Sequence, residues 1–337
     1  MGKKLGNRTL EFEKQIKVVS FANIVGKFES EGPLGKFFDI VINDEYYGEK
    51  TYEKAEVKLQ KNSLNLALQK GLLNLSHLDF IASGDLLNQC ISSSYSVRDN
   101  DVPYIGLFGA CSTMSLSTIV ACLTIESGFS KLAAGVTSSH FCTAERQFRQ
   151  PLEYGGQRTP SSQRTVTAGA AVIVGEGNSR INVSRISIGS VIDFLISDAN
   201  NMGAAMAPAA ADTLSAFFND TCTTPNDYDL ILTGDLGRVG SSILKDMMKE
   251  KNYCLGNNYN DCGYMIFDNV TQDTHAGGSG CGCSGAVLTG YVLPKIASGN
   301  LNNVLFMSTG ALMSPTASMQ GESIPGVAHL INFTGER

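Results

Sequence analysis

The residue best suited to chemistry in this chain is Cys111, which lies in the turn Gly-Ala-Cys-Ser-Thr at 109–113. An apolar run at 104–108 precedes this turn, and a helical pattern that reaches about Glu126 follows it. A thiol at the start of a helix lies near unpaired N–H groups and the positive end of the helix dipole, which lowers its pKa. Most free cysteines are small buried hydrophobes. Here the flanking Gly109 and Ala110 leave room for a ligand, so the turn predicts a functional thiolate.

A second group of reactive side chains follows an expected strand at 131–137. It comprises His140, Arg146 and Arg149, with Glu145 between them. The planar guanidinium of arginine binds carboxylates with two hydrogen bonds, so this group suits a dicarboxylate ligand. An ion pair between Glu145 and the arginines that orders the loop, or a dimer contact, explains the same residues, and both interpretations stay open.

A repeated segment indicates which elements position these residues. Residues 77–86 and 227–236 each contain an acidic turn, a short apolar run and Gly-Asp-Leu. Apolar runs without alternation are typical of strands buried on both faces of a parallel sheet. Helical patterns precede the two copies, at 52–70 and 206–218. Gly71 is expected to end the first helix and Pro208 to lie near the start of the second. The repeat therefore predicts two homologous α/β halves.

Further strands are expected in both halves, at 17–23, 131–137, 165–175, 180–189, 304–308 and 327–333. The segments 26–50 and 138–162 are expected to be irregular, and long excursions of this kind are usually functional or interfacial. We place the boundary near Asn178, which divides the chain into residues 1–178 and 179–337.

Composition restricts the class of protein. The chain is 43% hydrophobic and 17% charged, so it can bury a large core. Its net charge is −6, which makes nucleic acid an unsuitable partner. Its nine cysteines are irregularly spaced, as in a protein of a reducing compartment. The spacing of Cys281 and Cys283 fits no zinc site, so no metal site is expected. Neither a signal peptide nor a membrane-spanning run is expected.

The two halves and the Cys111 turn resemble the thiolase fold, here two pseudo-symmetric α-β-α-β-α halves. The chain is similar more specifically to the stage V sporulation protein AD family of spore-forming bacteria, over nearly its whole length. The segments that carry this resemblance are 84–89, 108–113, 137–140, 143–149, 153–157, 202–212, 232–236, 276–281 and 309–312.

The family resemblance implies a binding protein for dipicolinic acid, pyridine-2,6-dicarboxylate. It implies a role in the uptake of this compound during sporulation and in its release at germination. It further implies a peripheral location on the spore inner membrane, after synthesis in the cytoplasm, with other membrane proteins of the stage V sporulation A operon as partners. Thiolase-like proteins pair through an edge of the first half, so a homodimer is expected.

The resemblance also suggests a ligand site. It implies Asp85 as an acid in the pocket, which would repel a dicarboxylate unless the acid is protonated or bridged by calcium. We expect dipicolinate in a cleft above Cys111, between Asp85, Cys111 and His140 on one side and residues 277–281 and 309–311 on the other. No other cofactor is expected.

Histidines distinguish a binding protein from an enzyme of this fold. Condensing enzymes need second-half groups such as histidine to stabilise a developing oxyanion. The corresponding places here hold Gly234-Asp235 and the Gly-rich turn 277–283, and the chain's four histidines are elsewhere: His77, His140, His275 and His329. We therefore expect no catalytic residue and no enzyme. The alternative is a thioester-dependent acyltransferase or condensing enzyme of the ketoacyl synthase type that uses Cys111.

Overall fold

The computed structural model describes residues 2–148 and 158–336. Its largest element is a sheet whose main path has the strand order β11-β10-β13-β14-β9-β2-β8-β6-β4-β5. The first-half strands are β2 (Thr9–Gly26), β4 (Phe80–Gly84), β5 (Tyr104–Gly106), β6 (Leu132–Ser139) and β8 (Ala168–Gly175). The second-half strands are β9 (Ile181–Ile188), β10 (Leu230–Thr233), β11 (Tyr259–Asp261), β13 (Asn303–Ala311) and β14 (Gly326–Gly335). The short strands are β1 (Lys3–Leu5), β3 (Ile40–Ile42), β7 (Arg164–Thr165) and β12 (Gly278–Ser279), of which β7 and β12 pair separately.

The two halves of this sheet are related by internal symmetry. Outward from the central antiparallel pair β2 and β9, one half runs β2-β8-β6-β4-β5 and the other β9-β14-β13-β10-β11. In both halves the first two pairings are antiparallel and the last two parallel. The repeated segments form β4 and β10, which hold equivalent positions. The prediction of two pseudo-symmetric α/β halves is therefore confirmed, and Asn178 lies between β8 and β9.

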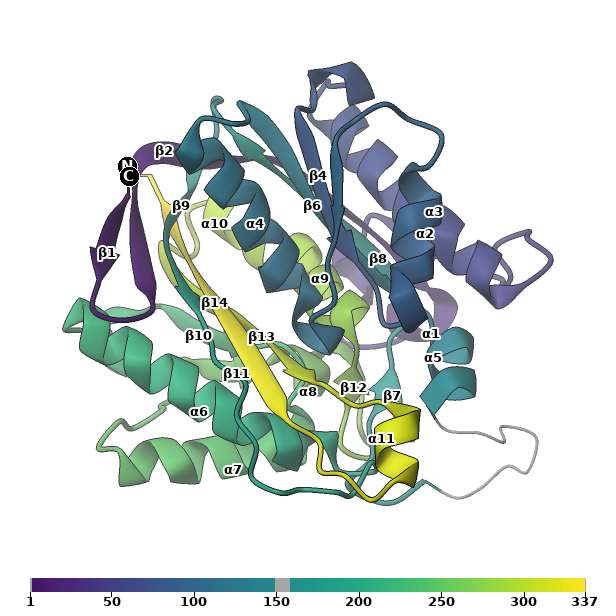
Figure 1. The fold of residues 1–337 in the computed structure, drawn as a ribbon, viewed down its shortest axis with the longest axis vertical. Helices are drawn as coiled ribbons and strands as arrows, with labels where there is room; N and C mark the ends of the chain where they lie inside the picture. Colours follow the sequence, from purple (N-terminus) through teal and green to yellow (C-terminus); the bar gives the residue numbers. More distant parts are fainter. Residues whose placement is uncertain (1, 149–157, 337) are drawn as a thin grey trace.

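Helices complete five layers, which the two halves build together (Figure 1). The helices α2 (Tyr52–Lys70) and α3 (Ile91–Val97) cover the outer face of the first half, and α6 (Met202–Thr221) and α7 (Gly237–Glu250) cover the second. Between the half-sheets lie α4 (Thr113–Ser127) and α9 (Cys281–Val287). In the described part of the chain, one helical segment, Ala110–Ser127, is long and apolar enough to cross a membrane, and 72% of it is buried as this central layer.

The predicted helices are present, with different ends. Helix α2 has the predicted bounds, but Gly71 has φ −81° and Leu72 adopts the left-handed conformation at φ 55°. Helix α6 begins earlier than predicted, because the Asn201 side chain accepts a hydrogen bond from the Ala204 N–H and caps it. Pro208 therefore lies inside α6, and its predicted place near the helix start is wrong.

Both segments expected to be irregular contain regular structure. The segment 26–50 includes α1 (Lys27–Ser30) and β3, and the segment 138–162 includes α5 (Phe141–Phe148). The remaining α-helices of residues 2–148 and 158–336 are α8 (Cys262–Ile266), α10 (Leu293–Ala297) and α11 (Pro315–Met319). Helix α5 carries several of the predicted site residues, so it bears directly on the site.

Candidate functional site

The Cys111 turn lies where the two halves meet. A 3₁₀ turn, Ala110–Ser112, precedes α4, and Ala110 has the positive φ of 49°. Strand β13 of the second half passes directly beside this turn, since a Cβ on Gly310 would lie 2.4 Å from the Gly109 carbonyl oxygen. Only glycine permits this approach, so both halves together fix the position of the thiol.

A small pocket lies beside Cys111. Its volume is about 40 Å³, enough for about three water molecules. Most of its wall is apolar, and its polar groups are the thiol, the Glu145 carboxyl and the hydroxyls of Thr165 and Ser279. The lining residues are Leu86, Phe108, Ala110, Cys111, Ala144, Glu145, Phe148, Thr165, Met202, Ser279, Ala311 and Met313.

A buried carboxyl, Asp235, lies beside the thiol. It follows β10 and accepts hydrogen bonds from the Gly280 N–H at 2.9 Å and the Thr309 hydroxyl at 2.8 Å. Burial raises the pKa of Asp235 to about 7, and its side chain also hydrogen-bonds the Cys111 thiol. The sequence placed Asp235 where an enzyme would carry histidine, and the structure brings it to Cys111.

The expected thiolate at Cys111 is a wrong prediction. Burial raises the pKa of the Cys111 thiol well above its ordinary value, and the charge of Asp235 adds to this. The Gly280 N–H acts in the opposite direction but is the smallest of these influences. Loss of solvation and a neighbouring carboxyl therefore outweigh the helix start, and the thiol is protonated at neutral pH.

Asp85 lies at the end of β4 but turns away from the pocket. Its carboxylate accepts hydrogen bonds from the Leu87 N–H at 2.9 Å, the Ser93 N–H at 2.8 Å and the Ser93 hydroxyl at 2.6 Å. Asp85 is completely buried, and it does not line the Cys111 pocket. This geometry gives the carboxylate a structural role in shaping the loop after β4.

Glu56 of α2 is a buried carboxyl that the sequence reasoning missed. It accepts hydrogen bonds from Ser138 at 3.2 Å and Thr143 at 2.6 Å. Burial, followed by the charge of Asp85, raises the pKa of Glu56 to about 8. The available signal was a glutamate on the same helix face as Leu59, Ser63 and Ala67, all of which are buried.

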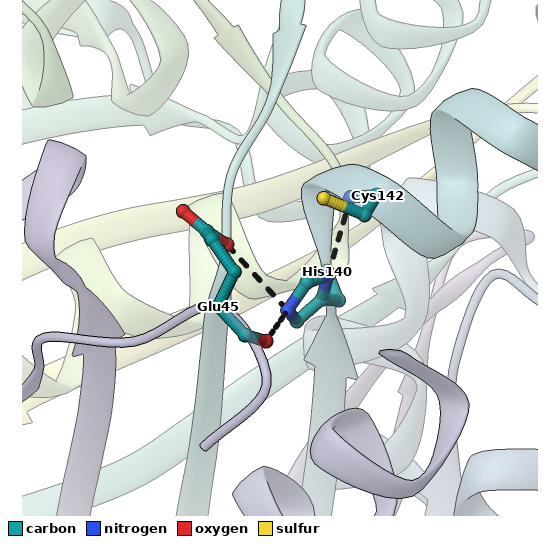
Figure 2. A group of neighbouring side chains, drawn as sticks. All are labelled: Glu45, His140 and Cys142. Atoms are coloured by element: carbon teal, nitrogen blue, oxygen red, sulfur yellow. Dashed lines mark hydrogen bonds and ion pairs between the residues drawn. The ribbon is translucent and has the colours of Figure 1, made fainter. Parts of the chain in front are cut away.

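His140 is buried against the segment that precedes α2 (Figure 2). Its Nδ1 accepts a hydrogen bond from the Cys142 N–H at 3.2 Å, so Nε2 carries the proton and donates it to the Glu45 carbonyl at 2.8 Å. Burial lowers the pKa of His140, which keeps the ring neutral. His140 does not line the Cys111 pocket.

Glu45, His140 and Cys142 present the closest approach to a metal-ligand set in the described residues, with ligand atoms within 4.8 Å of one another. A metal needs a free imidazole lone pair, with the other ring nitrogen donating a hydrogen bond. Here one nitrogen accepts an N–H and the other is already a donor to Glu45. The residues therefore fit a hydrogen-bonded support better than a metal site.

The two predicted arginines do not meet in the Cys111 pocket within the described structure. Arg146 forms an ion pair with Glu53 of α2 and lines a separate surface depression with Asn88 and Gln147. Arg149 lies outside the described residues. None of the four histidines lines the Cys111 pocket, where the described wall offers no basic side chain. Of the predicted ligand-binding side chains that the structure describes, only Cys111 lines this pocket. The wall predicted opposite it, residues 277–281 and 309–311, contributes Ser279 and Ala311.

Comparison with known proteins identifies relatives over nearly the whole chain. A family model described as stage V sporulation protein AD matches residues 6–334. Stage V sporulation protein AD of Bacillus subtilis strain 168 is 43% identical over 331 residues, which cover 98% of this chain and 98% of that protein.

Solved structures with a similar fold are thiolase-like. Acetyl-CoA acetyltransferase from Syntrophomonas wolfei aligns with a TM-score of 0.60 at 9% identity, over 95% of this chain and 98% of that one. Acat5 thiolase from Ascaris suum, in complex with coenzyme A, gives 0.58 at 10% identity, over 96% and 100%. 3-Oxoacyl-[acyl-carrier-protein] synthase III from Aquifex aeolicus VF5 gives 0.57 at 12% identity, over 95% and 99%. At such identities the likeness concerns the fold alone, and it confirms the predicted thiolase-like class.

Proposed function

The chain belongs to the stage V sporulation protein AD family, and we propose that it binds dipicolinic acid without catalysing a reaction. In this proposal it is part of the spore machinery that takes the compound up in sporulation and releases it in germination. It acts peripherally on the spore inner membrane, with other membrane proteins of the stage V sporulation A operon.

The contact between Cys111 and Asp235 carries the non-catalytic part of the proposal. Acyl transfer needs a thiolate nucleophile and hydrogen-bond donors for the developing oxyanion. Cys111 instead faces a carboxyl that favours the protonated thiol, and an ionised Asp235 would repel an oxyanion. The alternative, a thioester-dependent acyltransferase or condensing enzyme, would have to overcome both effects.

The lining of the Cys111 pocket bears on the form of the ligand. A dicarboxylate alone would meet the Glu145 carboxyl and no basic side chain among the described lining residues. A neutral complex of calcium with dipicolinate suits such a wall better, because calcium prefers oxygen ligands, which Glu145, Thr165 and Ser279 can supply. The pocket of about 40 Å³ must widen to admit a pyridine ring, and Phe108, which is half exposed, lies at its wall.

Titration calorimetry with dipicolinate, with and without calcium, tests this proposal. We expect saturable binding to one site per chain that is at least about tenfold tighter with calcium. Picolinate, with one carboxylate, should bind more weakly by about 1–3 kcal/mol, because a polar anchor loses its partner. Cys111→Ala should weaken binding by changing the pocket, whereas Cys254→Ala, at an exposed cysteine, should not. Full-strength binding by folded Cys111→Ala protein would place the ligand elsewhere.

We also propose that the chain forms a homodimer through β5, the last strand of the main sheet path. Among the described residues this strand pairs only with β4, so its outer edge is open to a second copy. Ile105 on β5 is 48% exposed and Phe108 just after it is 50% exposed. Sedimentation at micromolar concentration should give the mass of a dimer, and Ile105→Lys should shift it toward the monomer. A monomeric wild-type protein would contradict this.

A further inference from the structure

A second, larger depression lies in the second half of the chain, between α7, β11 and α8. Its volume is about 440 Å³, against about 40 Å³ beside Cys111. Its lining is polar, with two tyrosine rings. The lining residues are Arg238, Ser241, Ser242, Lys245, Gly256, Asn257, Tyr259, Asn260, Asp261 and Tyr264.

Two cations line this depression from the same side of α7. Arg238 and Lys245 are seven residues apart, so about two helical turns, or about 10 Å, separate their positions along the axis. Both are exposed, and neither forms an ion pair with any residue in the described ranges. The Lys245 ammonium lies 5.4 Å from the centre of the Tyr259 ring. Their positive charges are therefore available to a ligand.

The single acidic residue in the lining does not neutralise these cations. Asp261 is buried, and its carboxylate accepts hydrogen bonds from the N–H groups of Leu236 and Gly237, both at 2.9 Å. It also accepts one from the Thr233 hydroxyl at 2.7 Å and one from the Tyr264 N–H at 3.1 Å. Its oxygens are directed into the protein and occupied there, which leaves the depression positive.

The other groups suit an anion that also carries a flat portion. The exposed Ser242 lies on the same face of α7 as the cations, and Asn257 provides an amide, whereas the Ser241 hydroxyl oxygen is buried beneath them. Tyr264 of α8 is 48% exposed and adds a phenol to the lining. Donors and cations thus predominate over free acceptors around a cavity that is large enough for a small organic molecule.

We propose that this depression binds a small molecule with two anionic groups, one held by Arg238 and the other by Lys245. A phosphate chain and an aromatic dicarboxylate both present this chemistry. The site is separate from the Cys111 pocket, so the proposal does not depend on what binds there.

Titration calorimetry on the full chain, with pyrophosphate and dipicolinate as separate probes at low salt, tests the inference. At least one probe should bind the wild type saturably and more weakly as salt increases. The double substitution Arg238→Gln and Lys245→Gln should weaken binding at least tenfold. Lys249→Gln is a matched control, because Lys249 is exposed on the same helix but does not line the depression.

The outcomes separate this site from the Cys111 pocket. Binding that is lost in the double variant and retained in Cys111→Ala supports the α7 site, and the probe that binds identifies a phosphate chain or a dicarboxylate. Equal binding by wild type and double variant, or no saturable binding of either probe by the wild type, overturns the proposal. Dipicolinate binding that depends on Cys111 alone belongs to the first pocket and overturns a dicarboxylate role for the α7 site.

Discussion

Cys111 should react with iodoacetamide at pH 7.5 at least about tenfold more slowly than the exposed Cys222 and Cys254. The thiolate is the reactive form, and each unit by which a thiol pKa rises reduces its fraction about tenfold. Burial and Asp235 both raise the pKa of Cys111. Asp235→Asn removes the charge and should increase the Cys111 rate. Mass spectrometry of the labelled peptides gives each rate in one sample.

Asp246→Asn serves as the control, because Asp246 is an exposed carboxylate on α7 and should leave the Cys111 rate unchanged. Labelling of Cys111 as fast as that of Cys254 would contradict the protonated thiol.

The wild type should also form no carbon–carbon bond from acetyl and malonyl thioesters. Turnover that disappears in Cys111→Ser would favour the condensing enzyme.

The sequence located the Cys111 turn correctly but gave the wrong direction for its pKa. The position of a thiol at the start of a helix depends only on neighbouring residues, so the apolar run before the turn and the helical pattern after it are enough to predict it. The pKa of the thiol is raised mainly by burial and then by Asp235, which follows β10 more than a hundred residues away in the sequence. The sequence shows that Asp235 stands where a condensing enzyme would carry a histidine. Its contact with Cys111 is not visible in the sequence, because that contact depends on how the two halves pack.

The repeat at β4 and β10 predicted the symmetric fold because apolar runs determine buried strands wherever they occur. The sequence did not predict the direction in which side chains point at the ends of these strands. Asp85 directly follows β4, yet its carboxylate turns toward Ser93 and accepts hydrogen bonds from the Ser93 hydroxyl and N–H. His140 follows β6 as expected, yet its ring meets Glu45, from a segment predicted to be irregular. Strand order thus follows from the pattern, whereas the partners of each polar side chain depend on loops that carry no periodicity.

Several carboxyls that the sequence could not identify as buried should make stability decrease from pH 5.5 to pH 8. The folded protein raises the pKa of Glu56 from 4.5 to about 8, that of Glu29 from 4.5 to about 7 and that of Asp235 from 3.8 to about 7. Burial is the largest cause in each case. Between the unfolded and folded pKa values the native state holds more protons than the unfolded state, so its free energy of unfolding decreases as pH rises. The limit is about 1.4 kcal/mol per pH unit for each group.

Glu56→Gln isolates one of these groups. The amide oxygen can accept one of the two hydrogen bonds that Ser138 and Thr143 donate to the carboxyl, and the amide N–H can donate to the other hydroxyl. The amide cannot ionise, so the variant should lose less stability than the wild type between pH 5.5 and pH 8. The matched control is Glu53→Gln, one turn earlier on α2, whose exposed ion pair with Arg146 contributes little and should leave the pH dependence unchanged. Urea unfolding at each pH gives the free energies. Burial lowers the pKa values of His140 and His329, which opposes this decrease up to about pH 6.5, so the decisive range is pH 7 to pH 8. Wild-type stability that increases between pH 7 and pH 8 would show that these carboxyls ionise without cost in the folded protein. Protonation of Glu56 would then not stabilise the packing of α2 against Ser138 at the end of β6 and Thr143 at the start of α5.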